Sequence, residues 1–439
     1  MTDAEDRPAR HHQTLPPEIW NSVLGFLIRQ NGRKSIHLED LFEPPYATES
    51  LEVVDPDMRQ DRRTVTLVCR QWNALASQII PEYLIIRSIP QLRAILSRLE
   101  ETPSDGSPRV GIWVQRVDFE IKEPLSSPAT LDLIPRLLRR TPNLMIYVNK
   151  NGSDYAPETQ TPSAVLEALA KYCGSSLRRI EWSHVGEAPT WLDLANLLLR
   201  TPNLVTLRLT WIFSYDNPGH VDVALELPSL QTLYLGLIPD PSEALIALPL
   251  SWDPLLDYLA ARPGMLPALQ RFEIEIFPSR HGFFRVHGHK IKTFRTTNWN
   301  FPPTLPMTLP LMPNLDNLIL TQSSEYVMLP KSHPSLRRIC ISPFEDKPSA
   351  VPPRIFQRAV LLPLDHVLLS IDTTKLPRLE QVRVRNIGML ATLVDEPAWL
   401  LKWAQRWKFR GVAFCDVNGQ PYSLVRDPDN DPLLNAVRG

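Results

Sequence analysis

A short pattern that recurs along most of the chain is the strongest constraint on its fold: Leu-x-x-Leu-x-Leu, or a variant with other apolar residues. Copies with a proline two residues earlier begin at Leu204, Leu230, Leu269, Leu315, Leu336 and Leu379. Copies without that proline begin at Val114 and Leu177, and a degraded copy begins at Ile291. Most copies recur at intervals of about 20 to 29 residues, which is a period typical of stacked repeats. Because the last two apolar positions are separated by a single residue, as on one face of a strand, each copy predicts one strand.

Helical patterns separate several of these strands. Apolar residues at spacings of three and four mark the segments 131–140, 163–173, 191–200 and 254–262. Two of these segments end at Thr141-Pro142 and Thr201-Pro202, where proline stops a helix. A strand and a helix that alternate in one direction predict a parallel sheet inside and helices outside. The fold class is therefore expected to be α/β, with a curved solenoid as its main part.

The repeats resemble the leucine-rich-repeat family, although the copies are irregular and lack the asparagine that usually follows the third apolar position. The solenoid is expected over residues 81–425. Its first strand is expected at 81–87 and its first helix at 90–100, while a helix over 397–408 and a strand over 411–416 cap the other end. A long interval leaves room for one more strand at Leu364–Leu369, and another long interval indicates an inserted loop around 239–254. The polar tail, residues 426–439, is expected to be disordered.

The N-terminal residues carry two short apolar stripes at helical spacing. The first stripe consists of Ile19, Trp20, Val23, Leu24 and Leu27, and the second consists of Val65, Val68, Trp72, Leu75 and Ile79. Helices this short cannot bury such stripes alone, so they are expected to form a small bundle. Its core is meagre, and some apolar side chains should stay exposed for a partner.

The two ends of this region resemble an F-box: Leu15-Pro16-Pro17-Glu18-Ile19 at one end and Leu67-Val68-Cys69-Arg70-Gln71-Trp72-Asn73-Ala74-Leu75-Ala76 at the other. The resemblance implies an all-helical domain over residues 14–80 that binds the Skp-type adaptor of a cullin–RING ubiquitin ligase. It places the adaptor contacts at Leu15, Pro16, Ile19, Val23, Leu24, Val68, Cys69 and Trp72. The segment between the two ends is longer than in the family, so an inserted loop is expected at about 30–63, and residues 1–13 are expected to be disordered.

Composition argues for an interaction protein inside the cell. Lys and Arg total 47 against 48 Asp and Glu, so no global field favours nucleic acid or an anionic membrane. The four cysteines fit neither a disulfide framework nor a zinc site. The polar N-terminus has no secretory signal, and no run of about 18 apolar residues predicts a membrane span. These features indicate the cytoplasm, the nucleus or both.

No motif predicts catalysis or a cofactor. His281, His287 and His289 lie close in sequence but have no cysteine or carboxylate at ligand spacing, so no metal site is expected. No glycine-rich phosphate loop or nucleophile elbow occurs. The expected function is therefore that of a non-catalytic substrate receptor, the subunit that brings a target protein to the ligase. The alternative is a repeat scaffold or interaction module that is not coupled to ubiquitination.

The third, fifth and seventh positions of each copy should point away from the core, towards the concave face. Target-binding candidates at these positions are Tyr234, Glu273, Glu275, Arg295, Arg338, Arg383 and Arg385. Four arginines without an acid at the same positions make the C-terminal third basic. Such a cluster could bind an acidic or phosphorylated target segment, whereas the simpler alternative is a solvated charge pattern without function.

Overall fold

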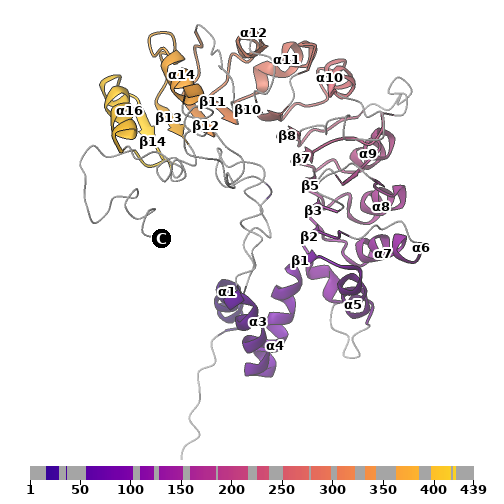
Figure 1. Cartoon of the computed structure of the whole chain (residues 1–439). Helices are drawn as coiled ribbons and strands as arrows, with labels where there is room; N and C mark the ends of the chain where they lie inside the picture. The colour runs from indigo at the N-terminus through magenta and orange to yellow at the C-terminus, as the bar shows by residue number, and fades with distance from the viewer. Residues whose placement is uncertain are drawn as a thin grey trace, which may run out of the picture.

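Twelve parallel strands form one continuous sheet in the computed structural model, and they line the inside of an arc whose outside is covered by helices (Figure 1). The structure describes residues 16–28, 36, 56–101, 109–122, 128–151, 159–183, 186–215, 225–236, 251–275, 278–297, 304–321, 332–342, 362–384, 397–416 and 419–421. A mixed α/β solenoid with the sheet inside is thereby confirmed. The expected disordered segments, residues 1–13 and 426–439, lie outside the described residues.

The strands follow the chain order along the sheet. They are β1 (Tyr83–Ile86), β2 (Arg116–Phe119), β3 (Ile146–Asn149), β5 (Arg179–Trp182), β7 (Thr206–Leu209), β8 (Thr232–Leu235), β9 (Arg271–Ile274), β10 (Thr293–Thr297), β11 (Asn317–Thr321), β12 (Arg338–Ser342), β13 (Gln381–Val384) and β14 (Ala413–Cys415). A separate parallel pair is formed by β4 (Thr159–Gln160) and β6 (Glu187–Ala188). Each predicted copy begins two residues before a strand, except at Leu364.

Helices and short helical turns connect the strands on the convex side. The helices are α5 (Ile89–Glu100), α6 (Pro128–Leu131), α7 (Leu133–Arg140), α8 (Ser163–Ala168), α9 (Trp191–Leu198), α10 (Asp253–Ala260), α11 (Gly282–His287), α12 (Thr304–Thr308), α14 (Leu362–Ser370) and α16 (Pro397–Phe409). The shorter turns are η2 (Ile80–Glu82), η3 (Val110–Trp113), η4 (Leu169–Cys173), η6 (Gly288–Lys290) and η7 (Leu309–Leu311).

One continuous apolar core lies between the sheet and these helices, and each repeat adds a layer to it. In the copy that starts at Leu204, the first leucine and the two strand leucines, Leu207 and Leu209, are all buried. Aromatic rings join neighbouring layers: Tyr147 lies 5.7 Å from Phe119 and 5.9 Å from Trp182 between ring centroids. Because each layer packs on the next, the repeats stabilise one another and no repeat forms a core alone.

Asparagines in the turns also join adjacent repeats. Asn143, Asn203 and Asn314 each follow a turn proline, and each side-chain amide donates to a main-chain carbonyl of the preceding repeat, at 2.9, 3.0 and 2.7 Å. The Pro-Asn-Leu turns therefore supply side-chain hydrogen bonds from one repeat to the one before it. Each such bond gives a main-chain carbonyl of a turn a hydrogen-bond donor from the next repeat.

One expected element and one expected boundary are wrong. The segment Leu364–Leu369, expected as a strand, belongs to the helix α14, where Leu364, Val367 and Leu368 are buried on one face at helical spacing. The loop expected at about 30–63 ends earlier, because the helix α3 (Pro56–Val68) already begins at Pro56. The strand β3 follows the Thr141-Pro142 turn, where the end of the preceding helix predicted that the chain turns into a strand.

Candidate interaction surfaces

Among the described residues, three helices form a bundle before the solenoid: α1 (Pro17–Ile28), α3 and α4 (Arg70–Ile79). Its core is small and contains Leu24, Ile28, Val65, Ala76 and Ile79. The rings of Trp20 and Trp72 lie 4.9 Å apart beside it. The last helix, α4, passes through η2 directly into β1, so the bundle joins the solenoid without a separate linker.

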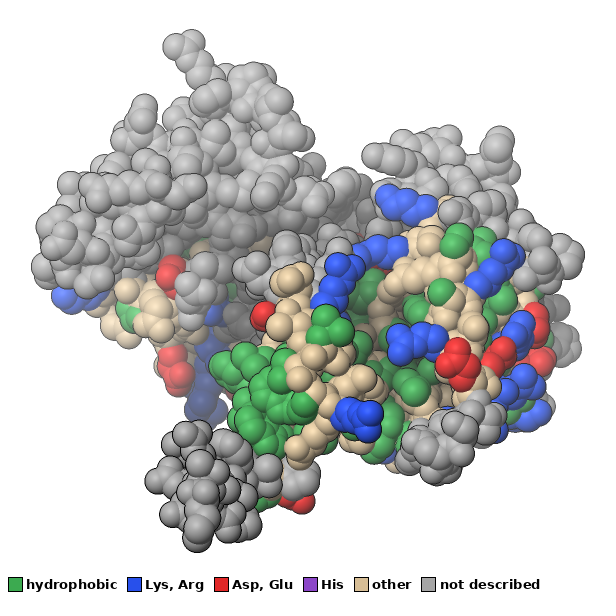
Figure 2. All heavy atoms as spheres, turned by 90° about the horizontal axis from the view of Figure 1, so that it is seen from below, with side chains coloured by type: hydrophobic (Ala, Val, Ile, Leu, Met, Phe, Trp, Pro, Cys, Tyr) green, Lys and Arg blue, Asp and Glu red, His purple; other side chains and the backbone are tan. Residues whose placement is uncertain are grey.

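Apolar side chains stay exposed on this bundle. We call them the helical surface: Ile19, Val23, Phe26 and Leu27 of α1 with Leu67 and Val68 of α3. Phe26 is 91% exposed and Leu67 is 83% exposed, values unusual for side chains of this size. Seen from below, where the bundle lies nearest to the viewer, hydrophobic side chains gather on this side of the molecule (Figure 2).

The predicted adaptor contacts fall into three groups. Pro16, Ile19, Val23, Val68 and Cys69 are exposed, as such contacts require, whereas Leu15 lies outside the described residues. Leu24 is fully buried and Trp72 is half-buried against the core, so both support the helical surface from behind. Cys69 also caps α4, because its Sγ accepts the main-chain N–H of Trp72 at 3.4 Å.

Two prominent members of the helical surface, Phe26 and Leu67, were missed as contacts in the sequence. Phe26 follows Val23 by three residues and Ile19 by seven, so helical spacing already placed it beside them. Leu67 immediately precedes Val68 in the quoted motif. The same periodicity that predicted the other contacts could therefore have found Phe26.

The inner face of the sheet carries two rows of polar side chains in register. The first row, at the start of the strands, includes Arg116, Arg179, Thr206, Thr232, Arg271, Thr293 and Asn317. The second row, two residues later, includes Asp118, Glu181, Arg208, Tyr234, Glu273 and Arg295. Residues two apart on a strand face the same side, so an arginine in the first row lies beside an acid in the second.

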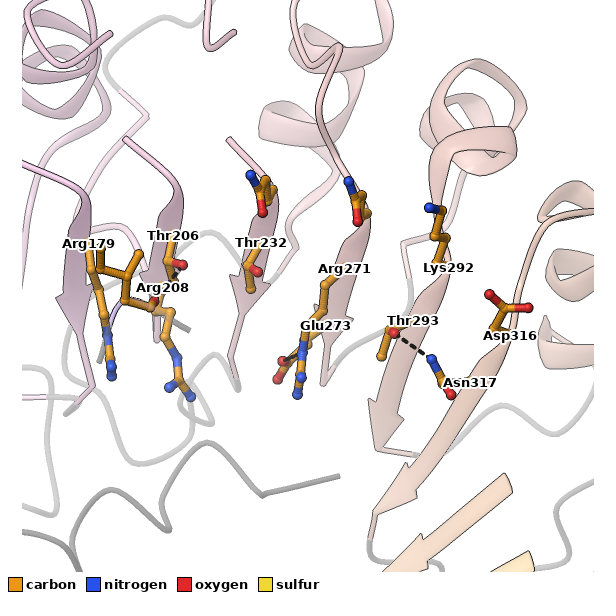
Figure 3. Close-up of a pocket in the computed structure, with 13 residues that line it drawn as sticks. Arg179, Thr206, Arg208, Thr232, Arg271, Glu273, Lys292, Thr293, Asp316 and Asn317 are labelled. Carbon is orange, nitrogen blue, oxygen red and sulfur yellow. Dashed lines mark hydrogen bonds and ion pairs between the residues drawn. The ribbon is translucent and has the colours of Figure 1, made fainter. Parts of the chain in front are cut away.

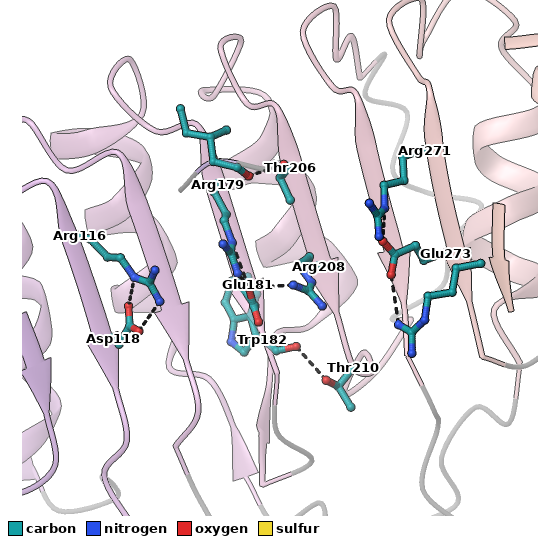
Figure 4. Close-up of polar contacts among 12 residues, drawn as sticks. Arg116, Asp118, Arg179, Glu181, Trp182, Thr206, Arg208, Thr210, Arg271 and Glu273 are labelled. Carbon is teal, nitrogen blue, oxygen red and sulfur yellow. Dashed lines mark hydrogen bonds and ion pairs between the residues drawn. The ribbon is translucent and has the colours of Figure 1, made fainter. Parts of the chain in front are cut away.

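Ion pairs connect the two rows (Figure 4). Arg116 Nη2 lies 2.6 Å from Asp118 Oδ2 on β2. On β5 and β7, Glu181 contacts Arg179 and lies 3.8 Å from Arg208 Nη1. On β9 and β10, Glu273 contacts Arg271 and lies 3.2 Å from Arg295 Nη1. We call these three groups the buried ladder, since all of their residues are at most 8% exposed.

Burial and pairing act in opposite directions on the carboxyl groups of the ladder. Burial disfavours the charged form of Glu273, but Arg271, Arg295 and Arg208 together lower its pKa to about 2. Burial likewise opposes the ionisation of Glu181, whose pKa is nevertheless lowered by Arg179 and Arg208. Both carboxylates therefore stay charged at neutral pH, and their arginines are largely neutralised.

The expected exposed basic site is therefore wrong for most of its residues. Tyr234, Glu273, Glu275, Arg295 and Arg383 are buried, and Arg338 is half-buried. The physical reason is local pairing: Arg295 contacts Glu273, the Tyr234 hydroxyl donates to Glu275 at 2.5 Å, and Arg383 Nε donates to the carbonyl of Asp416 at 3.1 Å. Arg385 lies outside the described residues. The recurring Arg-x-acid pattern of β2, β5 and β9 was the sequence signal for this pairing.

A cavity of about 310 Å³ opens along the first row, and we call it the strand-face cavity (Figure 3). It is lined by Ile36, Arg179, Thr206, Arg208, Gln231, Thr232, Gln270, Arg271, Glu273, Lys292, Thr293, Asp316 and Asn317. The hydroxyl of Thr206 donates to the main-chain carbonyl of Ile36 at 2.9 Å, and Asn317 Nδ2 donates to the hydroxyl of Thr293 at 2.9 Å. The sequence prediction missed Thr206, Thr232, Thr293 and Asn317 because, apart from Tyr234, it selected charged residues on this face.

Other kinds of site receive no support from the described residues. Among them, no three histidine, cysteine or acidic side chains gather as metal ligands would. The described helices also include none with the length and apolar character needed to cross a bilayer. All four cysteines are free, and burial raises the pKa of Cys173 to about 12, which makes this thiol a poor nucleophile.

Comparison with known proteins adds no assignment: no family model matches the sequence, and no curated protein matches it significantly.

Proposed function

We propose that this protein is the substrate-recognition subunit of a cullin–RING ubiquitin ligase of the cytoplasm or nucleus. In this proposal the N-terminal bundle binds a Skp-type adaptor, the solenoid binds a target protein, and the chain itself catalyses no step. The observation that carries the proposal is the helical surface, which exposes Phe26, Leu67 and their apolar neighbours on a bundle with a small core. The two ends of this bundle resemble an F-box, and this resemblance indicates a Skp-type adaptor as the partner.

Exposed apolar side chains of this kind are favourable only when a partner covers them. Large apolar side chains at the centre of an interface typically contribute about 2 kcal/mol or more each when they are truncated. Pro16, Ile19, Val23, Val68 and Cys69 are exposed at the positions that the F-box resemblance assigns to adaptor contact. Patches of this sort on soluble proteins commonly mark interaction sites.

The connection between the bundle and the solenoid supports the same role. Since α4 continues through η2 into β1, a target bound by the solenoid would keep a fixed position relative to a bound adaptor. A receptor subunit needs such coupling, because ubiquitin transfer depends on where the target is held. A flexible linker would disperse the target over many positions.

Co-expression with a Skp-type adaptor tests the proposal. The wild-type chain should capture the adaptor, whereas Ile19→Asp and Val68→Asp should each weaken capture because they place a charge in the helical surface. Met307→Asp is the matched control: Met307 is 62% exposed on α12 of the solenoid, and its variant should bind like the wild type. Circular dichroism checks that each variant is folded. Failure of the folded wild-type chain to capture the adaptor would reject the proposal.

Measurement of cellular target abundance separates the receptor from a scaffold. Deletion of the gene should stabilise proteins that co-purify with the solenoid, and ubiquitin should accumulate on them in wild-type cells when the proteasome is blocked. Adaptor capture without any change in protein abundance would instead favour a scaffold that is not coupled to ubiquitination.

A further inference from the structure

Three polar atoms at the wall of the strand-face cavity have no hydrogen-bond partner among the described residues. They are Arg208 Nε, Arg271 Nη2 and Asn317 Oδ1, and their residues are 4%, 8% and 4% exposed. Buried polar groups are nearly always hydrogen-bonded, so three such atoms at one cavity indicate that a binding partner supplies their bonds. Arg208 Nε and Arg271 Nη2 are donors from two guanidinium groups, and the amide oxygen Asn317 Oδ1 is an acceptor. They therefore require an acceptor near Arg208 and Arg271 and a donor near Asn317.

The charges at the cavity and of its direct ion-pair partners favour an anionic acceptor. Five cations, Arg179, Arg208, Arg271, Lys292 and Arg295, stand against three acids, Glu181, Glu273 and Asp316, so an excess of positive charge remains after the ladder pairs are counted. Glu273 accepts from Arg271 Nε and from Arg295 Nη1, one with each of its oxygens. A carboxylate that enters between Arg208 and Arg271 would thus gain charge-assisted hydrogen bonds to donors that are still unpaired.

The dimensions of the cavity favour an extended ligand. Its lining residues come from six adjacent strands, β5 to β11, which at the usual strand spacing span about 24 Å. A spherical cavity of 310 Å³ would be only about 8 Å across, so this space is long and narrow. One end already contacts a main-chain carbonyl, since the hydroxyl of Thr206 donates to that of Ile36. An extended polypeptide has this shape and offers carbonyl and N–H groups along its length.

We infer that the strand-face cavity binds an extended segment of the target that carries a carboxylate. The carboxylate accepts hydrogen bonds from Arg208 Nε and Arg271 Nη2, and a main-chain or side-chain N–H of the segment donates to Asn317 Oδ1. Arg271 and Asn317 lie two strands apart, about 10 Å, which three residues of extended chain span. The inference deepens the proposed function and rests on it, because it names how the solenoid recognises its target.

Three defined peptide pools test the inference and distinguish the source of the carboxylate. The first contains random hexapeptides with Asp and Glu and an amidated C-terminus, the second lacks Asp and Glu but has a free C-terminal carboxylate, and the third lacks both. Each pool is passed over the immobilised full-length protein, and the retained peptides are measured by mass spectrometry. The inference predicts retention from the first or the second pool and none from the third. Equal retention of the third pool, or retention of none, would overturn it.

Charge-conserving variants locate the binding in the cavity. Arg208→Lys with Arg271→Lys keeps both positive charges but removes the two unpaired donors, so affinity for a retained peptide should fall at least about ten-fold. Asn317→Ala leaves every charge in place and should also weaken binding. The control is Arg116→Lys, which changes an arginine in the same row on β2 but outside the cavity, and it should bind like the wild type.

Two readouts separate this inference from the proposed function. Adaptor capture, which depends on the helical surface, should be unchanged in all of these variants. If the wild-type chain captures the adaptor but retains no carboxylate peptide, the inference fails and the proposed function stands. If the folded double variant, or folded Asn317→Ala, binds the peptide as well as the wild type does, the cavity is not the binding site and the inference is overturned.

Discussion

The N-terminal bundle and the inner face of the solenoid distribute their side chains in opposite ways. The bundle exposes apolar groups such as Phe26 and Leu67, whereas the inner face buries charged groups such as Glu273 and Arg295. A contiguous patch of exposed apolar groups commonly marks an interaction site, while buried charges are costly unless they are paired. The apolar surface of the bundle is therefore open to another protein. The charged groups of the sheet face are mostly paired with one another already.

This contrast changes where binding energy is expected to come from. On the bundle, association should gain energy from removing apolar surface from water. On the sheet face, the ladder charges already neutralise one another, and the unpaired atoms around the strand-face cavity, such as Arg271 Nη2, are available to a ligand. Counting arginines along the face therefore overestimates its attraction for acidic targets.

The largest expected effect is on the buried ladder. Glu273→Gln leaves Arg271 and Arg295 without a counter-charge in a buried position, so the free energy of unfolding should fall by about 3 to 5 kcal/mol. Denaturant unfolding measures this change. In the control, Glu380→Gln breaks an exposed pair with Arg337 at 3.7 Å and should cost less than about 1 kcal/mol. Equal effects would mean that the ladder is hydrated and that the contrast between the two regions is false.

Close packing between repeats gives the next effect. A Cβ atom at Gly174 would collide with the main-chain carbonyl of Arg200 in the following repeat, whereas one at Gly264 would meet no atom within 4 Å. Gly174→Ala should therefore reduce the free energy of unfolding by about 1 to 3 kcal/mol, and Gly264→Ala should leave it nearly unchanged. Thermal unfolding of the two variants compares them directly. Similar stability would show that the repeats pack less tightly than described.

Acid should reduce the free energy of unfolding through the ladder carboxylates, by less than the two substitutions above. The pKa of Glu273 is lower in the folded chain, about 2, than the usual value of about 4.3 in an unfolded chain. Its contribution is thus complete above about pH 4.3 and is lost as the pH falls towards 2. Burial raises the pKa of Glu187, so that group contributes with the opposite sign. Denaturant unfolding from pH 5 to pH 2 should show a decline that is shallower in Glu273→Gln.

Much of the fold could be predicted because apolar periodicity records it directly. The copies from Leu204 and Leu230 mark their strands, and the helix α5 lies one residue from its expected start. Periodicity was insufficient at Leu364, where a run of apolar residues fits a strand or a helix and only the packing of Val367 and Leu368 decides.

The candidate sites could be predicted less well. Helical spacing found Ile19, Val23 and Val68, but it could not separate the exposed Val23 from the buried Leu24, which depends on how α1 packs against the other helices. On the sheet, alternation correctly placed Arg271 and Glu273 on one face. The Arg-x-Glu spacing also indicates that they pair, but their burial could not be predicted, because it depends on neighbouring strands. The cavity likewise arises from residues on six strands.

The most direct test of the two-surface account is the adaptor affinity of two variants, measured by titration calorimetry on the full-length protein. The account predicts that Ile19→Asp with Val68→Asp loses affinity by at least about 100-fold, since two interface side chains are worth roughly 2 kcal/mol each. It predicts that Arg208→Lys with Arg271→Lys binds the adaptor as the wild type does. Unchanged adaptor affinity in the first variant, or an equal loss in both, would contradict the assignment of separate roles to the bundle and the solenoid.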